Sequence, residues 1–263
     1  MIETNRDIAA QILAAFDSGT SLEAGRATAG TSPADGYRIA AALSEMRVAR
    51  GARVIGRKIG FTNRTIWPVY GVDRPMWGEM YDTTVHEASA GPVSLDGFLE
   101  PRIEPEIAFG IARCPEPGLS DADLLACCDW CAHGFEIVQS PYPGWQFTTG
   151  EAIASGAMHG AFVMGPRVEI GVVTPQTLSA VMCTLSVDGA VKERGTAANV
   201  LDGPVSALRA LVDGLAAQDG VRPIEVGDII TTGTMTDAYP IAPGERWSTD
   251  ISAPLAGLSI QMV

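Results

Sequence analysis

The stretch from residue 99 to residue 109, LEPRIEPEIAF, places charged side chains where a buried strand should be apolar. If the stretch is extended, side chains alternate between two faces, so Arg102, Glu104 and Glu106 share one face and the apolar side chains take the other. Same-face neighbours on a strand lie roughly 7 Å apart, which lets two carboxylates converge on one cation. The pattern predicts either a metal-binding strand or an edge strand with a solvated charged face, and Pro105 is compatible with such an edge.

Composition and charge narrow the classes of protein that fit. Hydrophobic residues make up 46% of the 263 residues, enough for one large domain or for a domain with a smaller appendage. A net charge of −13 disfavours a nucleic-acid partner, because binding phosphates needs a basic surface. No uninterrupted apolar run approaches the roughly 20 residues of a membrane span, and residues 1–11 lack the features of a secretory signal. We therefore expect a cytoplasmic protein with no nucleic-acid or membrane partner.

The five cysteines are an odd number in a sequence without an export signal, which indicates reduced thiols. Cys128 and Cys131 form a C-x-x-C pair within residues 124–132, a segment that we expect to be helical. Since no second pair completes a zinc site, we interpret these cysteines as small buried side chains.

Two helices are expected at the start of the chain. The helical spacing of apolar residues, each run opened by a Thr or Ser that can cap it, predicts one helix over residues 4–19 and a second over residues 32–51. We expect them to form a small helical N-terminal subdomain, residues 1–52, ahead of a larger domain, residues 53–263, that carries the charged strand.

A strand is expected next, at residues 53–61, where Arg57 and Lys58 interrupt an otherwise apolar run. We expect one of these two cations to be held by a partner. Residues 62–82 are rich in aromatic residues, Gly and Pro. That composition is typical either of a lid over a pocket or of a loop that two tryptophans pin to the core.

The remaining elements mix strands and helices without the regular alternation of a doubly wound parallel sheet. One predicted strand, residues 133–139, carries a single charge, Glu136, which makes it a third candidate metal ligand. The other expected elements are a helix from Ser120 to Cys131, a hairpin turning at Asp188 and Gly189, an amphipathic helix over residues 204–215, and strands near residues 229–234 and 258–263.

Five sequence blocks stand in the order and spacing seen in one family of enzymes. The blocks are GRKIGFT (residues 56–62), GVDRPMWG (71–78), PRIEPEIAF (101–109), FEIVQS (135–140) and VGDIITTGT (226–234). Through them the chain resembles the 2-keto-4-pentenoate hydratases and 4-oxalocrotonate decarboxylases of the fumarylacetoacetate hydrolase superfamily. The resemblance covers nearly the whole length.

The resemblance implies an α+β fold with a mixed β-roll core, a bound Mg²⁺ or Mn²⁺ ion, and homo-oligomers. By position, Glu104, Glu106 and Glu136 would be the protein ligands of the ion, with water or substrate in the remaining places. Lys58 would lie beside the ion. Residues 232–234 would help to line the site.

Hard oxygen ligands with open positions suit Mg²⁺ or Mn²⁺, which can chelate a 2-oxo acid through its carboxylate and keto oxygens. As a Lewis acid the ion stabilises an enolate, the electron sink both for adding water to a conjugated double bond and for losing CO₂ from a vinylogous keto acid. A lysine beside the ion can shuttle protons or hold a carboxylate, and the alternative for Lys58 is a structural ion pair.

Two departures from the family pattern concern the pocket. Met76 stands where hydratases typically carry an acid/base Asp, and the decarboxylases share an apolar residue there. Residues 154–165, ASGAMHGAFVMG, differ from the usual Asp-Asn-Ala-Ser run, which makes His159 a candidate proton carrier. The alternative for His159 is a packed histidine bonded to backbone. Glu79 is a candidate replacement for the lost Asp, the alternative being a solvated lid carboxylate.

We therefore predict a metal-dependent lyase that hydrates a small anionic 2-oxo or 2-hydroxy-dienoic acid from aromatic-ring cleavage. A decarboxylase on the same scaffold is the second hypothesis, followed by a C–C hydrolase of acylpyruvates and by a metal-binding homologue without catalysis. The expected catalytic residues are Lys58, His159 and Glu79. The expected substrate contacts are Arg102, Trp77, Thr232, Gly233 and Thr234.

Overall fold

The computed structural model describes residues 4–23, 30–218 and 220–263, so residues 1–3 and 24–29 of the predicted N-terminal subdomain lie outside the described part. The helices are α1 (Asn5–Ser18), α2 (Pro33–Ala49), α3 (Trp67–Tyr70), α4 (Asp121–Leu125), α5 (Thr149–Ala154), α6 (Pro175–Ser179) and α7 (Pro204–Ala216). The strands are β1 (Val54–Gly60), β2 (Met76–Tyr81), β3 (Val85–Glu87), β4 (Arg102–Ile111), β5 (Cys128–Val138), β6 (His159–Glu169), β7 (Met182–Val187), β8 (Ala190–Thr196), β9 (Ile229–Thr234), β10 (Tyr239–Pro240), β11 (Arg246–Ile251) and β12 (Ser259–Gln261).

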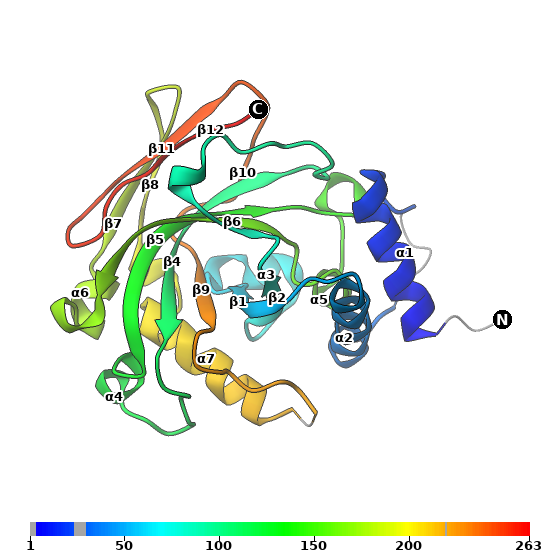
Figure 1. The fold of residues 1–263 in the computed structure, drawn as a ribbon, viewed down its shortest axis with the longest axis horizontal. Coiled ribbons are helices and arrows are strands. Elements are labelled where there is room, and N and C mark those ends of the chain that lie inside the picture. Colours follow the sequence, from blue (N-terminus) through cyan, green and yellow to red (C-terminus); the bar gives the residue numbers. More distant parts are fainter. Residues whose placement is uncertain (1–3, 24–29, 219) are drawn as a thin grey trace.

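The main sheet has eight strands in the order β2-β1-β9-β4-β5-β6-β3, with β10 pairing against β4. Its pairs are mixed: β1 runs parallel to β9 and β3 parallel to β6, whereas β4 and β5 run antiparallel along their whole length. The sheet curls around an inner face, and a second sheet, β12-β11-β7-β8, lies across one side of it (Figure 1). This architecture confirms the predicted α+β class with a rolled mixed sheet.

The outer face of the main sheet is apolar and covered by other elements. Helix α7 buries Leu208 and Leu211 in one cluster with the outward side chains Ile107 and Phe109 of β4, and it lies below β9 in Figure 1. The second sheet contributes Trp247 to a separate cluster with outward residues of β4 and β5. Each buried Leu or Phe contributes about 1.5–3 kcal/mol, so the fold is stabilised on the outer face and the inner face is left for polar groups.

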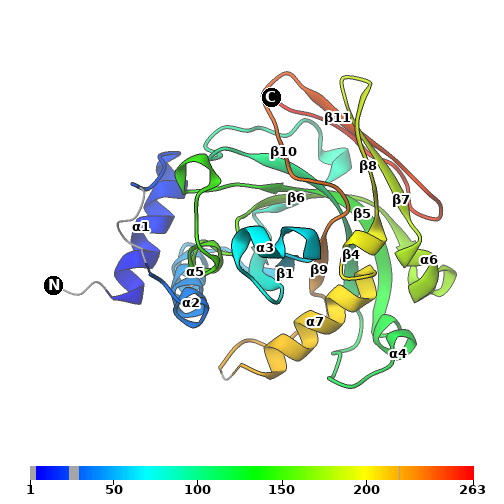
Figure 2. The same ribbon diagram turned by 180° about the vertical axis from the view of Figure 1, so that it is seen from behind.

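The first two helices lie together at one end of the molecule, on the left in Figure 2. Thr4 and Asp7 form a reciprocal capping box at the start of α1, and Ser32 caps α2 as the sequence predicts. Ile12 of α1 and Leu43 of α2 are fully buried in one cluster with Ala154 of α5. This pair of helices is therefore attached to the sheet domain through α5.

Three expectations for local structure are corrected. Strand β4 lies between β9 and β5, so the edge-strand alternative is wrong. The predicted helix through Cys131 ends at Leu125, because Cys128 and Cys131 belong to β5 and its ladder with β4 outweighs local helix propensity. Residues 76–81 of the expected loop form β2, which pairs with β1.

The rest of residues 62–82 has features of both predicted structures, the loop pinned by two tryptophans and the lid over a pocket. Trp67 donates from its indole nitrogen to the carbonyl of Phe61 at 2.7 Å, and Trp77 stacks on Tyr37 of α2, so both tryptophans pin the segment. Ile66 and Tyr70 nevertheless line a cavity. Within the described residues, no helix combines the length and apolar character needed to cross a bilayer.

Candidate metal centre and active site

The two long antiparallel strands bring the carboxylates together. In the ladder, Glu104 of β4 lies directly opposite Glu136 of β5, and Glu106 is two residues further along the same face. One oxygen from each of the three side chains lies within 4.8 Å of the others. Like charges opposite each other in a sheet are destabilising, so the arrangement requires positive charge between them.

Glu106 is fixed by the backbone of β9. The amide of Gly233 donates to Glu106 Oε2 at 2.9 Å, at a point where the pairing of β9 with β4 shifts register. Gly233 has φ 104°, and a Cβ there would lie 1.9 Å from Thr62 Oγ1. Only glycine meets both demands, because other residues are strained at that φ.

Lys58 supplies positive charge inside the cluster. It extends from β1, and its Nζ lies 3.2 Å from Glu136 Oε2 with both side chains almost fully buried. Burial lowers the pKa of Lys58, but the surrounding carboxylates, Glu136 foremost, outweigh it and hold that pKa above its ordinary value. Its neighbour Arg57 points to the outer face and donates to the carbonyls of Arg222 and Pro223. Both cations are thus held.

One lysine does not neutralise three carboxylates. Burial, together with the charge of Glu136, raises the pKa of Glu104 to about 7 and the pKa of Glu106 well above its ordinary value. Burial also acts on Glu136, but Lys58 and His159 outweigh it, so that its pKa is lowered. In the described part of the chain, Glu106 Oε1 is buried without a hydrogen-bond partner, and Glu136 Oε2 has only the ion pair with Lys58. Carboxylate oxygens that face one another with so few partners fit a divalent cation with oxygen ligands.

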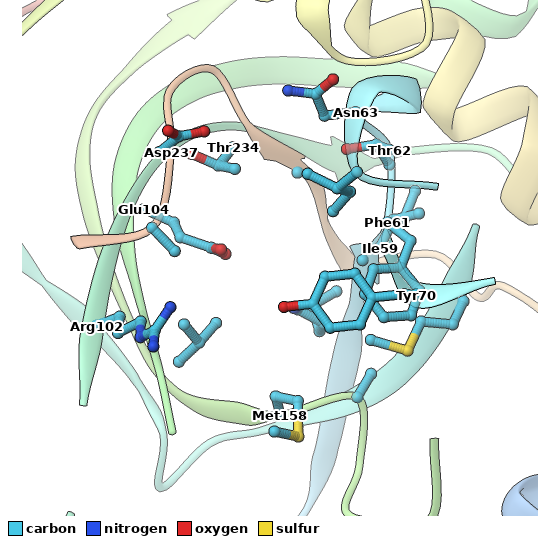
Figure 3. A pocket seen from close by; sticks show the side chains of 18 of the residues that line it. Ile59, Phe61, Thr62, Asn63, Tyr70, Arg102, Glu104, Met158, Thr234 and Asp237 are labelled. Carbon is cyan, nitrogen blue, oxygen red and sulfur yellow. The ribbon is translucent and has the colours of Figure 1, made fainter. Parts of the chain in front are cut away.

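A cavity of about 280 Å³ opens beside these carboxylates. Figure 3 shows Glu104 and Arg102 pointing into it from one side and the hydroxyl of Tyr70 from the other. The guanidinium of Arg102 stacks over the Trp145 ring, 4.2 Å from its centroid. The remaining wall is largely apolar. The cavity therefore presents the Arg102 guanidinium, the carboxylate cluster and an apolar wall to a small anionic ligand.

The predicted site residues divide between this cavity and other places. Lys58, Arg102, Glu104, Gly233 and Thr234 line the cavity, with Glu106 and Glu136 buried behind it. Thr232 instead points away and donates to the carbonyl of Ile107.

Trp77 and Glu79 are not brought to the carboxylates, which corrects their predicted roles. They alternate with Met76 along β2, so Met76 faces the cavity while Trp77 and Glu79 face the outer side. There Glu79 accepts a hydrogen bond from Ser44 of α2. His159 does not line this cavity either. It contacts Glu136 Oε1 on the side of Glu136 that faces away from the cavity.

Several residues in or near the cavity are not predicted by the sequence patterns. Tyr70 lines the cavity from the end of α3, Asn63 and Asp237 line it from loops, and the stacking partner Trp145 lies in the turn before α5. Thr231 does not line the cavity, but it is level with Lys58 in the β1–β9 ladder, and its buried hydroxyl has no hydrogen-bond partner among the described residues. The aromatic richness of residues 62–82 signalled Tyr70, whereas nothing local marks Asp237 or Thr231.

The raised pKa of Glu104 predicts how pH affects the metal-free protein. A carboxyl whose pKa rises from 4.5 unfolded to about 7 folded favours folding below pH 4.5, and this contribution is lost as pH rises through 7. With a chelator present, we expect the free energy of unfolding of Glu104→Gln, relative to that of the wild type, to rise by about 2 kcal/mol between pH 5 and pH 8. This value is lower than the full pKa shift would give, because solvent at the cavity mouth screens the charge of Glu104. Denaturant unfolding at both pH values measures this, and a pH-independent difference would contradict it.

Comparison with known proteins places the chain in a family. It is 34% identical over 200 residues to a 4-oxalocrotonate decarboxylase from Pseudomonas sp., covering 75% of each chain, and 33% identical over 218 residues to a 2-hydroxyhexa-2,4-dienoate hydratase from Comamonas testosteroni, covering 81% and 80%. The 4-oxalocrotonate decarboxylase from Pseudomonas putida G7, solved with magnesium and adipate, superposes with a TM-score of 0.91 at 25% identity over 98% of this chain and 97% of that one. No family model matches the chain.

The chain therefore belongs to the family of 2-keto-4-pentenoate hydratases and 4-oxalocrotonate decarboxylases. It is a lyase, and its rolled sheet is the fold of the fumarylacetoacetate hydrolase superfamily, as the sequence blocks predict. A fumarylpyruvate hydrolase from Pseudomonas aeruginosa shares that fold more distantly, with a TM-score of 0.59 at 14% identity over 80% of this chain and 89% of that one.

Proposed function

We propose that the protein is a Mg²⁺- or Mn²⁺-dependent lyase that removes CO₂ from a small 2-oxo acid with a conjugated double bond, of the kind that aromatic-ring cleavage produces. The observation that carries the proposal is the cluster of half-buried Glu104 with buried Glu106 and Glu136, beside a cavity that Lys58 and Arg102 enter. Neighbouring structures of the same fold hold magnesium with adipate, or Mn²⁺ with pyruvate, which supports the cation and the acid ligand.

The three glutamates would hold the cation, which supplies Lewis acidity for the enolate that forms at the 2-oxo group. Arg102 forms no ion pair among the described residues, so its guanidinium is available to a substrate carboxylate. The Trp145 ring keeps that guanidinium in place. When the C–CO₂ bond breaks, its electron pair passes along the conjugated chain to the keto oxygen, and a proton then adds at carbon. Lys58 is the group that carries this proton or holds the developing negative charge.

Met76 favours decarboxylation over hydration. It is buried at the cavity wall, and a Cβ built on Gly60 would contact both the Met76 methyl group and Lys58 Nζ, so Met76 and Lys58 are neighbours. Adding water to a double bond needs a base that activates the water, and a thioether cannot serve as one. Hydration, the leading hypothesis from the sequence, remains the second candidate because hydratases are among the relatives at 33% identity.

Product analysis tests the proposal. We expect the protein with Mg²⁺ to release CO₂ from 2-hydroxymuconate and to leave 2-hydroxypentadienoate largely unchanged, with both activities lost in chelator. A hydrated acid as the main product would show that the protein is a hydratase instead. No turnover of either compound would favour a homologue without catalysis.

Met76→Asp tests the role of this position. The new carboxylate would lie beside Lys58, which keeps it ionised, and we expect it to raise hydration of 2-hydroxypentadienoate by on the order of tenfold or more. Met76→Asn is the matched control, since it has the same shape without a base. Equal hydration by both variants would mean that position 76 does not act as the base.

The cellular setting is proposed on narrower support. We infer a cytoplasmic homo-oligomer that binds neither nucleic acid nor membrane. All five cysteines are free thiols in the structure, which agrees with a reducing compartment. The oligomer follows from the family resemblance, and light scattering of the purified protein measures it.

A further inference from the structure

We infer that His159, anchored by Thr84, leaves Glu136 only one oxygen for the metal ion and thereby favours Mg²⁺ or Mn²⁺ over Ca²⁺. This role is distinct from the proton transfer predicted for His159 from the sequence. The inference rests on the proposed metal site and adds a residue that positions a ligand and sets the choice of metal.

The contacts of His159 form a chain that leads away from the cavity. Its Nδ1 lies 2.9 Å from Glu136 Oε1, and its Nε2 lies 2.9 Å from Thr84 Oγ1. The side chains of His159 and Glu136 are 3% and 0% exposed. Since an ionised carboxylate can only accept, His159 donates through Nδ1, and in the neutral ring Nε2 accepts from the Thr84 hydroxyl, which also lies 3.1 Å from the Tyr81 carbonyl. Both ring nitrogens are thereby occupied, so the imidazole cannot rotate freely.

The hydrogen bonds from Thr84 through His159 to Glu136 give the two oxygens of Glu136 different partners. His159 takes Oε1, and Oε2 faces the other carboxylates without a hydrogen bond, next to Lys58 Nζ. Glu106 shows the same division, because the Gly233 amide takes its Oε2 and leaves Oε1 bare. Each of these two buried glutamates therefore turns one oxygen without a hydrogen bond toward the cluster, and in Glu136 that oxygen also pairs with Lys58.

Single-oxygen carboxylates distinguish between cations. Mg²⁺ takes six ligands at about 2.0–2.1 Å, whereas Ca²⁺ takes six to eight at about 2.3–2.6 Å and readily binds both oxygens of one carboxylate. A Glu136 whose Oε1 is held by His159 cannot offer that second oxygen without breaking the hydrogen bond. Releasing Oε1 should therefore help Ca²⁺ and should loosen the position of Oε2 that Mn²⁺ needs.

The test compares Mn²⁺ and Ca²⁺ affinities, measured by calorimetry on the full-length protein. We expect His159→Leu to weaken Mn²⁺ binding by about 10–100-fold, as is usual when a partner of a metal ligand is removed, while Ca²⁺ binding changes less. The ratio of the two dissociation constants should then shift toward Ca²⁺ by about tenfold. His159→Asn keeps a donor near the position of Nδ1, so it should stay within about threefold of the wild type.

His133→Leu is the matched control. Like His159 of β6, His133 of β5 is a buried histidine with both ring nitrogens bonded, to the Glu106 carbonyl at 2.9 Å and to Thr249 at 2.8 Å. It faces away from the carboxylate cluster, so its loss should lower the unfolding temperature without changing the ratio. Thr84→Val, compared with Thr84→Ser, provides a second route that keeps the imidazole: only the valine should shift the ratio.

The outcomes separate this inference from the proposed function. A wild type that binds neither ion would overturn the metal site itself. A wild type that binds Mn²⁺, with an unchanged Mn²⁺-to-Ca²⁺ ratio in both His159→Leu and Thr84→Val, would overturn the positioning role alone. Parallel shifts in His159→Leu and His133→Leu would show a general effect of destabilisation and would also overturn it.

Discussion

Replacing Glu106 by Gln is expected to weaken Mn²⁺ binding by at least about a hundredfold and to abolish turnover, while the metal-free fold stays intact. Gln has the same shape and can still accept the hydrogen bond from the Gly233 amide, but it removes a negative charge and a bare carboxylate oxygen from the cluster. The pKa of Glu106 lies well above its ordinary value, so the metal-free protein already disfavours that charge. The variant should therefore unfold at the same temperature as the metal-free wild type or at a higher one.

Calorimetry with Mn²⁺ and thermal unfolding in chelator check this result. Asp237→Asn is the matched control, because Asp237 is an exposed carboxylate that also lines the cavity but is not one of the three clustered glutamates. It should keep its Mn²⁺ affinity within about threefold. An unchanged Mn²⁺ affinity in Glu106→Gln would contradict the assignment of this residue as a ligand.

Most of the fold was predictable from local patterns. The alternation in residues 99–109 gave the inward glutamates, and the caps at Thr4 and Ser32 marked the first two helices. The failed helix at residues 120–131 shows the limit of such patterns. There an apolar run has no clear period, and the ladder between β4 and β5 decides the structure. The division at residue 52 stays a prediction.

The candidate site was predictable where it depends on strand alternation and family blocks. Asp237 reaches the cavity from a loop, and its position depends on how distant segments meet, which no local pattern records. Glu79 is a predicted site residue because it stands three residues beyond Met76, and Trp77, next to Met76, is a predicted substrate contact. Once residues 76–81 are a strand, alternation sends these two outward and Met76 inward.

Lys58→Met gives the second large effect. We expect it to lower the stability of the metal-free protein, to raise the affinity for Mn²⁺ and to lower turnover. Removing Lys58 takes away the positive charge 3.2 Å from Glu136 Oε2, so the metal-free protein should lose about 3 kcal/mol at pH 7. The loss should shrink at lower pH, because carboxylates that take up protons no longer repel one another. Mn²⁺ should bind more tightly, on the order of tenfold, because the lysine no longer competes for the same carboxylate oxygens.

Turnover decides between the two roles considered for Lys58. If the lysine only neutralises the carboxylates, a saturating divalent cation replaces its charge and should restore both stability and activity. If it carries the proton or stabilises the enolate, stability should return with Mn²⁺ while turnover stays below about a thousandth of the wild type. We expect the second result, since Lys58 lines the cavity beside the carboxylates and is packed next to Met76 at its wall. Near-normal turnover in Mn²⁺-saturated Lys58→Met would identify the lysine as a structural ion pair.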